Sequence, residues 1–71
     1  MDRVEDLPVG VQGIRLGQLL KLVGVADTGG AAKQLLCEGL VSVNGHPEVR
    51  RGAHLSAGDV VSCGDQRWRV R

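Results

Sequence analysis

The spacing of apolar residues changes near residue 40, and this change constrains the fold more than any other feature of the chain. Before it, apolar residues recur at the three- and four-residue intervals of one helical face: Leu16, Leu19, Leu20 and Val23. After it, Val41 and Val43 alternate with polar residues, which is the period of a β-strand. The 71-residue chain is therefore predicted to be α+β, with two short helices packed on a small twisted antiparallel sheet.

Two short helices are predicted within residues 17–39. Gly24 is placed to end the first helix, and Asp27 or Thr28 can cap the second, which ends at Gly39. The apolar face of the second helix consists of Ala31, Ala32, Leu35 and Leu36. Because only a few residues separate the helices, we expect them to cross at a sharp angle or to lie antiparallel.

A β-hairpin is predicted directly after the second helix. Asn44-Gly45 is the strongest short hairpin signal in the chain, because both residues tolerate the positive φ of the favoured turn. The next strand is expected to run from Val49 to Leu55 and to be broken at Gly52.

Two more strands are expected near the C-terminus, at Val60–Cys63 and at 67–71. Apolar and charged residues alternate strictly in the last strand. Trp68 and Val70 should therefore face the core, and the arginines around them should face solvent.

The first residues of the chain are expected to lie outside the domain. Residues 1–13 are predicted to be a frayed leader that ends in a short strand near 11–16, and residues 14–71 to be a single domain. The N-terminus lacks the basic start and apolar stretch of a secretion signal, and no apolar run approaches the roughly 20 residues of a membrane span. We therefore expect a cytoplasmic protein with no membrane partner and with both cysteines reduced.

The start of the second predicted helix carries the sharpest local signal for ligand binding. Thr28, Gly29 and Gly30 place a hydroxyl and free backbone N–H groups there, and Lys33 follows about one turn later. Helix N-termini attract phosphates, and glycines let a phosphate approach the backbone closely. The alternative is a plain capped helix that follows a glycine-rich turn.

Positive charge gathers in the C-terminal third, where residues 50–71 carry five arginines against two aspartates. Arg50 and Arg51 are adjacent, so a regular strand would point their side chains to opposite faces, one of them along the surface that carries Lys33. The other three arginines occupy one face of the last strand, where guanidinium groups can bind phosphates. The alternative in both places is a solvated strand whose charges protect it from aggregation.

The sequence gives little support for enzymatic or metal chemistry. It has no nucleophile elbow of the G-x-S-x-G kind, and its carboxylates lie mostly at turns and helix ends, so we expect no enzyme. Four residues of metal-ligand type are separated by seven or eight residues and form no close pair: Cys37, His46, His54 and Cys63. We therefore expect no metal and no cofactor, although convergence of these four would indicate a small metal-binding regulator.

Aromatic side chains are nearly absent, since Trp68 is the only one. Proteins that bind single strands on a sheet stack the bases on exposed aromatic side chains. If this chain binds RNA, it should therefore grip the backbone and the helical shape through Arg, Lys and main-chain amides.

An ordered set of motifs runs through most of the chain: Arg15-Leu16, Leu19-Leu20-Lys21, Gly24, Ala32-Lys33, Gly39, Val41-Ser42-Val43-Asn44-Gly45 and Leu55-Ser56-Ala57-Gly58-Asp59-Val60. In this order they resemble the RNA-binding domain named after ribosomal protein S4, also called the alpha-L motif. The likeness is strongest to the small stand-alone bacterial YbcJ-like members, which share the Leu-Leu-Lys motif, the glycine-opened second helix and a Glu-x-Arg sequence, here Glu48-Val49-Arg50.

The resemblance implies a non-catalytic protein that binds structured RNA, ribosomal or transfer RNA, through the second helix and the adjacent hairpin. We also expect the protein to be a monomer. Carried onto matching positions, the resemblance implies these RNA-binding residues: Arg15, Thr28, Gly29, Gly30, Lys33, Gln34, Asn44, Arg50, Arg51 and His54. The chain departs from the pattern at Gly29, where many members have Arg, and at Gly17, where many have Asp. The alternative function is a ribosome-associated module that contacts protein, which an exposed apolar patch would favour.

Overall fold

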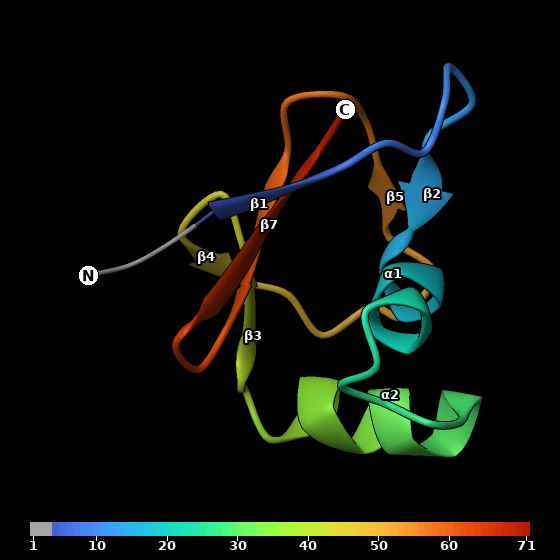
Figure 1. Ribbon diagram of the computed structural model, residues 1–71. Helices are drawn as coiled ribbons and strands as arrows, with labels where there is room; N and C mark the ends of the chain where they lie inside the picture. The colour runs from blue at the N-terminus through green and yellow to red at the C-terminus, as the bar shows by residue number, and fades with distance from the viewer. Residues whose placement is uncertain (1–3) are drawn as a thin grey trace.

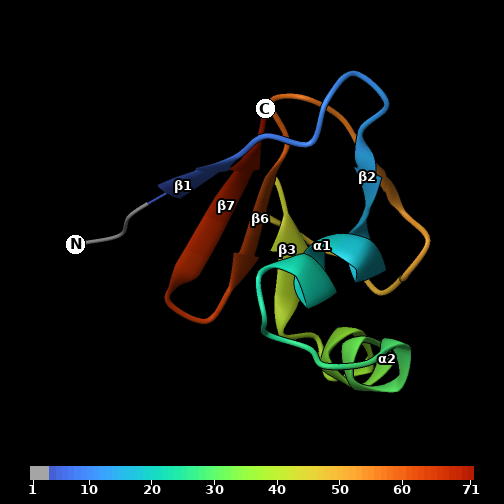
Figure 2. The ribbon, with the colours of Figure 1, turned by 45° about the vertical axis from the view of Figure 1, so that its right-hand side comes forward.

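The computed structural model describes residues 4–71 and places two helices on the same side of a five-stranded sheet (Figure 1, Figure 2). The elements follow the chain in this order: β1 (Val4–Leu7), β2 (Ile14–Arg15), α1 (Leu16–Leu22), α2 (Gly29–Cys37), β3 (Val41–Val43), β4 (His46–Pro47), β5 (His54–Leu55), β6 (Val60–Cys63) and β7 (Gln66–Val70). The α+β class is as predicted. Neither helix in this part of the chain is long and apolar enough to cross a membrane.

The main sheet is larger than predicted, and it is mixed instead of antiparallel. Its strand order is β1-β7-β6-β3-β4, in which β1 runs parallel to β7 and the other neighbours are antiparallel. The parallel pair aligns Val4 with Arg67 and Leu7 with Val70. Residues 4–7 are therefore not frayed, because the backbone of β7 supplies their hydrogen-bond partners. The division of the chain at residue 13 stays a prediction.

A second, two-stranded sheet joins β2 to β5, with Arg15 opposite His54. The strand predicted from Val49 to Leu55 is wrong over most of its length, since only its last two residues form a strand. The cause is local: the backbone N–H groups of Val49 and Arg50 both donate to the Glu48 carboxylate, at 3.1 Å each. Amides bound to a side chain cannot also form a strand ladder.

Both helices end where the sequence predicted. Gly24 and Gly39 adopt φ values of +82° and +72°, which glycine tolerates and side chains avoid. Thr28 is the N-cap of α2, and its Oγ1 accepts a 3.1 Å hydrogen bond from the Ala31 N–H. Of the two predicted caps, Thr28 is therefore the one used.

The predicted hairpin turn joins β3 to β4. Asn44 and Gly45 have φ values of +52° and +84°, the positive pair that a type I′ turn requires. The Asn44 amide then ties the turn to β6, because Nδ2 donates to Asp59 at 3.1 Å and Oδ1 accepts from the Val60 N–H at 2.9 Å.

The core lies between the helices and the main sheet. It is formed by eleven buried apolar residues: Leu16, Leu19, Leu20, Ala26, Ala32, Leu36, Val41, Leu55, Val61, Trp68 and Val70. Trp68 and Val70 are buried and Arg67 and Arg71 are exposed, which confirms the predicted alternation along β7.

Candidate nucleic-acid interface

A cleft of about 320 Å³ lies where the start of α1, the start of α2 and the segment before β5 meet. Seven residues line it: Arg15, Gly17, Gln18, Lys21, Gly29, Arg51 and Gly52. Three of the seven are cationic and none is acidic. A concave surface lined by one sign of charge concentrates ions of the opposite sign, so the cleft favours an anion.

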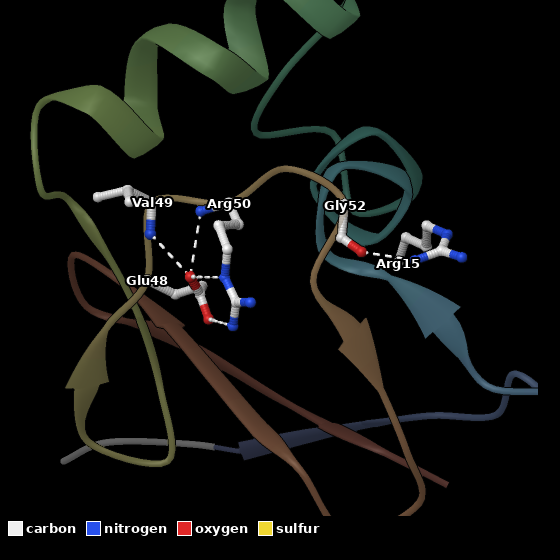
Figure 3. A network of polar contacts seen from close by, with 5 residues as sticks. All are labelled: Arg15, Glu48, Val49, Arg50 and Gly52. Carbon is white, nitrogen blue, oxygen red and sulfur yellow. Dashed lines mark hydrogen bonds and ion pairs between the residues drawn. The ribbon is translucent and has the colours of Figure 1, made fainter.

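Backbone hydrogen bonds between the start of α1 and the segment at 51–53 build one wall of the cleft. The Leu16 N–H donates to the Ala53 carbonyl at 2.8 Å, and the Gly17 N–H donates to the Arg51 carbonyl at 2.9 Å. Arg15 adds a side-chain bond, since its Nη1 donates to the Gly52 carbonyl at 2.6 Å (Figure 3). The first turn of α1 therefore sets the position of Arg51, although the two are far apart in sequence.

Arg51 connects that wall to α2. Its Nη1 donates a long hydrogen bond of 3.5 Å to the Gly29 carbonyl, in the first turn of α2. The backbone N–H groups of that turn have no partner within the helix, and they carry the positive end of the helix dipole. The positively charged Arg51 guanidinium and the positive end of the α2 dipole thus lie side by side.

The remaining predicted residues of α2 lie along the same helix. Lys33 is exposed and follows Gly29 by four residues, which places it on the same helical face one turn later. Gln34 is also exposed, and its Nε2 donates to the Glu38 carboxylate at 3.0 Å. Neither residue lines the cleft, so this part of the predicted site is an extension along α2.

Arg50 faces a carboxylate instead of the cleft. Its Nε and Nη2 both donate to Glu48 at 3.2 Å, and Figure 3 shows its guanidinium well apart from that of Arg15. These hydrogen bonds from the Arg50 side chain, with those from the backbone, lower the Glu48 pKa from its ordinary 4.5 to about 2. The carboxylate in turn raises the pKa of Arg50. Arg50 therefore carries its charge beside a permanent counter-charge.

Asn44 and His54 are engaged within the protein. The amide of Asn44 uses both its donor and its acceptor on the start of β6, as described above. His54 Nε2 lies 2.9 Å from the Gln12 carbonyl, and the ring nitrogen is the donor because a carbonyl can only accept. Both contacts favour a role in holding the turns at 10–13 and 44–45.

Of the ten predicted residues, the cleft thus gathers Arg15, Gly29 and Arg51. Sequence reasoning missed Gln18 and Lys21, although a usable signal exists. These two follow Arg15 at intervals of three residues, so all three lie near one face of the first helix. The polar Gln18 and the cationic Lys21 could therefore have been added to the predicted site together with Arg15.

Arg69 of β7 and Arg71, which directly follows that strand, differ from the cleft cations because they lie beside an acid. The Asp6 carboxylate on β1 forms ion pairs with Arg69 Nη1 at 3.9 Å and with Arg71 Nε at 3.8 Å. The parallel pairing of β1 with β7 brings this carboxylate to the arginine face. Elsewhere within residues 4–71, no three His, Cys, Asp or Glu side chains come together as a metal site would need.

Comparison with known families assigns the fold. The model of the family described as the S4 domain matches residues 8–71. The chain belongs to the S4 domain family. The match starts before the end of the predicted leader and runs through the last strand, so the S4 domain includes the cleft, both helices and β7.

Two relatives of this S4 domain are informative. The probable ribosome maturation protein RlbA of Bacillus subtilis is 47% identical over 55 residues, which is 78% of this chain and 78% of that protein. The solution structure of YbcJ from E. coli, whose description reports an alpha-L motif involved in RNA binding, superposes with a TM-score of 0.69. It is 32% identical, and the match covers 99% of this chain and 90% of YbcJ. The resemblance to the alpha-L motif and its YbcJ-like members is therefore confirmed.

Proposed function

We propose that this S4 domain is a non-catalytic protein of the cytoplasm that binds structured RNA through the sugar–phosphate backbone. The observation that carries the proposal is the cleft, where Arg15, Lys21 and Arg51 converge with no acidic residue in the lining. Guanidinium and ammonium groups form strong charge-assisted hydrogen bonds with phosphate oxygens, and the RNA backbone presents these oxygens at every nucleotide.

The surroundings of the cleft favour backbone recognition over base recognition. Base stacking requires an exposed aromatic side chain, and the single aromatic residue, Trp68, is only 3% exposed. The groups that remain for recognition are cations, amides and a helix start, all of which suit phosphates and the shape of an RNA helix.

The binding surface that we propose has a centre and an extension. Arg15, Lys21, Gly29 and Arg51 form the centre in the cleft. The exposed Gly30 and Lys33 extend it along α2 at the spacing of one helical turn, and Thr28 caps this helix start. Arg50 lies outside the cleft and adds long-range attraction, reduced by Glu48.

Ribosomal RNA is the class of RNA that we favour. The relative from Bacillus subtilis bears a name that denotes ribosome maturation, and the E. coli relative is described by a motif involved in RNA binding. Both descriptions concern those proteins. The first supports ribosomal over transfer RNA as the partner here, and the second supports RNA binding in general. With this partner, we propose that the protein acts as a monomer on the ribosome or its precursors.

Filter binding of the purified protein to three RNAs tests the proposal: a folded ribosomal RNA fragment, a transfer RNA, and an unstructured polyribonucleotide of equal length. We expect the tightest binding to the folded ribosomal fragment, with affinity that falls steeply as salt rises. Crosslinking in cells, followed by sequencing of the bound RNA, then identifies the target. Equal affinity for the unstructured polymer, or no recovery of RNA after crosslinking, would contradict the proposal.

A further inference from the structure

Gly17 leaves a space in the cleft wall that the side chain of Arg51 fills. A Cβ atom built on Gly17 would overlap Arg51 Cγ, and it would lie 3.2 Å from Cδ and 3.3 Å from the Arg51 carbonyl oxygen. The first of these contacts is closer than real side chains tolerate. Gly17 has ordinary helical geometry, so its backbone conformation does not require glycine. The requirement comes instead from the close contact with the Arg51 side chain.

The backbone of Arg51 cannot withdraw to make room. The Gly17 N–H holds its carbonyl at 2.9 Å, and the adjacent Leu16 N–H holds the Ala53 carbonyl at 2.8 Å. A side chain at position 17 would therefore have to turn the Arg51 stem about its first torsion. Because the stem carries the guanidinium, that rotation would also move the charge out of the cleft.

The far end of the same side chain reaches the second helix. Arg51 Nη1 lies 3.5 Å from the Gly29 carbonyl, and a Cβ on Gly29 would lie 3.2 Å from Nη1. One extended arginine thus spans the cleft from Gly17 on α1 to Gly29 on α2, with a glycine where it meets each helix.

We infer that Gly17 is a positioning residue for RNA binding: it seats the stem of Arg51 so that the guanidinium stands beside the start of α2, where it meets one backbone phosphate. The inference rests on the proposed function for its ligand. The seat, meaning the packing of the Arg51 stem against Gly17, is a property of the free protein. Arg51 is then the contact residue, and Gly17 acts only through it. The pair forms a unit in which either substitution alone removes the same phosphate contact.

The seat is tested without RNA by a thermal double-mutant cycle of Gly17→Ala, Arg51→Ala and the double variant, followed by Trp68 fluorescence. Alanine favours a helix more than glycine does, so without the clash Gly17→Ala should not lower the melting temperature. We expect it to lower the melting temperature in the wild-type background and to do so much less in the Arg51→Ala background, where Cγ is gone. Equal shifts in both backgrounds would overturn the inference. Gly52→Ala is the matched control, because its Cβ would meet nothing within 4 Å.

The role in binding is tested by the salt dependence of affinity for the folded ribosomal RNA fragment. Arg51→Ala should reduce the slope of log affinity against log salt by about one, the value for one lost phosphate contact. Gly17→Ala should reduce it by the same amount, and the double variant should match Arg51→Ala. Leu22→Ala, at an exposed position of α1 outside the cleft lining, should keep the wild-type slope. A wild-type slope for Gly17→Ala, or additive losses in the double variant, would overturn the inference while leaving RNA binding intact. Absence of RNA binding by the wild-type protein would instead refute the proposed function.

Discussion

Replacement of Leu20 by Ala should destabilise the domain severely, whereas the same replacement at Leu22 should not. Leu20 is fully buried among the helix and sheet residues of the core, and Leu22, two residues later on α1, is 60% exposed. Truncation of a buried Leu costs about 2–5 kcal/mol, through lost burial and the cavity left behind. A chain of this size has a total stability of roughly 4–11 kcal/mol, so Leu20→Ala removes a large part of it.

Urea unfolding followed by the fluorescence of Trp68 measures this difference, because the single Trp is buried in the same core. Leu20→Ala should lose about 3 kcal/mol and lower the melting temperature by more than about 10 °C. Leu22→Ala should lose less than about 1 kcal/mol. Equal losses for the two variants would refute the packing of α1 described above.

Three further predictions concern polar groups. The Glu48 carboxyl, held by hydrogen bonds from Arg50, should titrate near its pKa of about 2 in an NMR pH titration, and a midpoint near 4.5 would contradict the contact. Because the folded pKa is lowered, this pair stabilises the fold above the ordinary pKa of 4.5, and its contribution should fade as pH falls toward 2. Thr28→Ala should cost about 1 kcal/mol in urea unfolding, since Oγ1 caps α2, and Thr28→Ser should cost little; equal losses would argue against the cap. Asp6→Asn should cost less than about 1 kcal/mol, because its ion pairs with Arg69 and Arg71 are long and exposed; a larger loss would show that β1 depends on them.

The elements that local signals define were predictable from the sequence. Gly24 and Gly39 end their helices because the left-handed conformation needed there is open to glycine. The Asn44-Gly45 turn and the alternation around Trp68 depend on neighbouring residues alone. Each of these features is fixed within a few residues of chain, which is the range over which sequence patterns act.

Pairings between distant segments were not predictable in the same way. Residues 4–7 pair with β7 across almost the whole chain, and the glycines and proline that follow them gave the pattern of a frayed tail. The strand expected from Val49 is absent because the Glu48 carboxylate binds the amides of the next two residues. A side chain that bonds to nearby backbone leaves no trace in hydrophobic spacing.

The sequence indicated the kind of candidate site, a cationic surface at a helix start, but only some of the residues that form it. Glycine and cation content directed attention to the start of α2 and to Arg51, and the cleft brings Gly29 and Arg51 together. The contribution of the first helix to the site was missed, because the contact of Gly17 with Arg51 depends on backbone hydrogen bonds between α1 and the segment at 51–53. The side chains of the adjacent Arg50 and Arg51 lie apart, because Arg50 binds Glu48 and the stem of Arg51 packs against Gly17.

The central claim is that cations of the cleft, and not positive charge in general, bind the RNA backbone. Two variants that lose the same charge separate these possibilities. The cleft variant is Arg15→Gln/Lys21→Gln/Arg51→Gln, and the β7 variant is Arg67→Gln/Arg69→Gln/Arg71→Gln, on β7 and directly after it. The measurement is the salt dependence of affinity for the folded ribosomal RNA fragment, made after Trp68 fluorescence has shown that both variants fold. The cleft variant should lose about 3 from the slope of log affinity against log salt, at about one per phosphate contact, and the β7 variant should stay near wild type. Equal slopes for the two variants, or a greater loss for the β7 variant, would contradict the account.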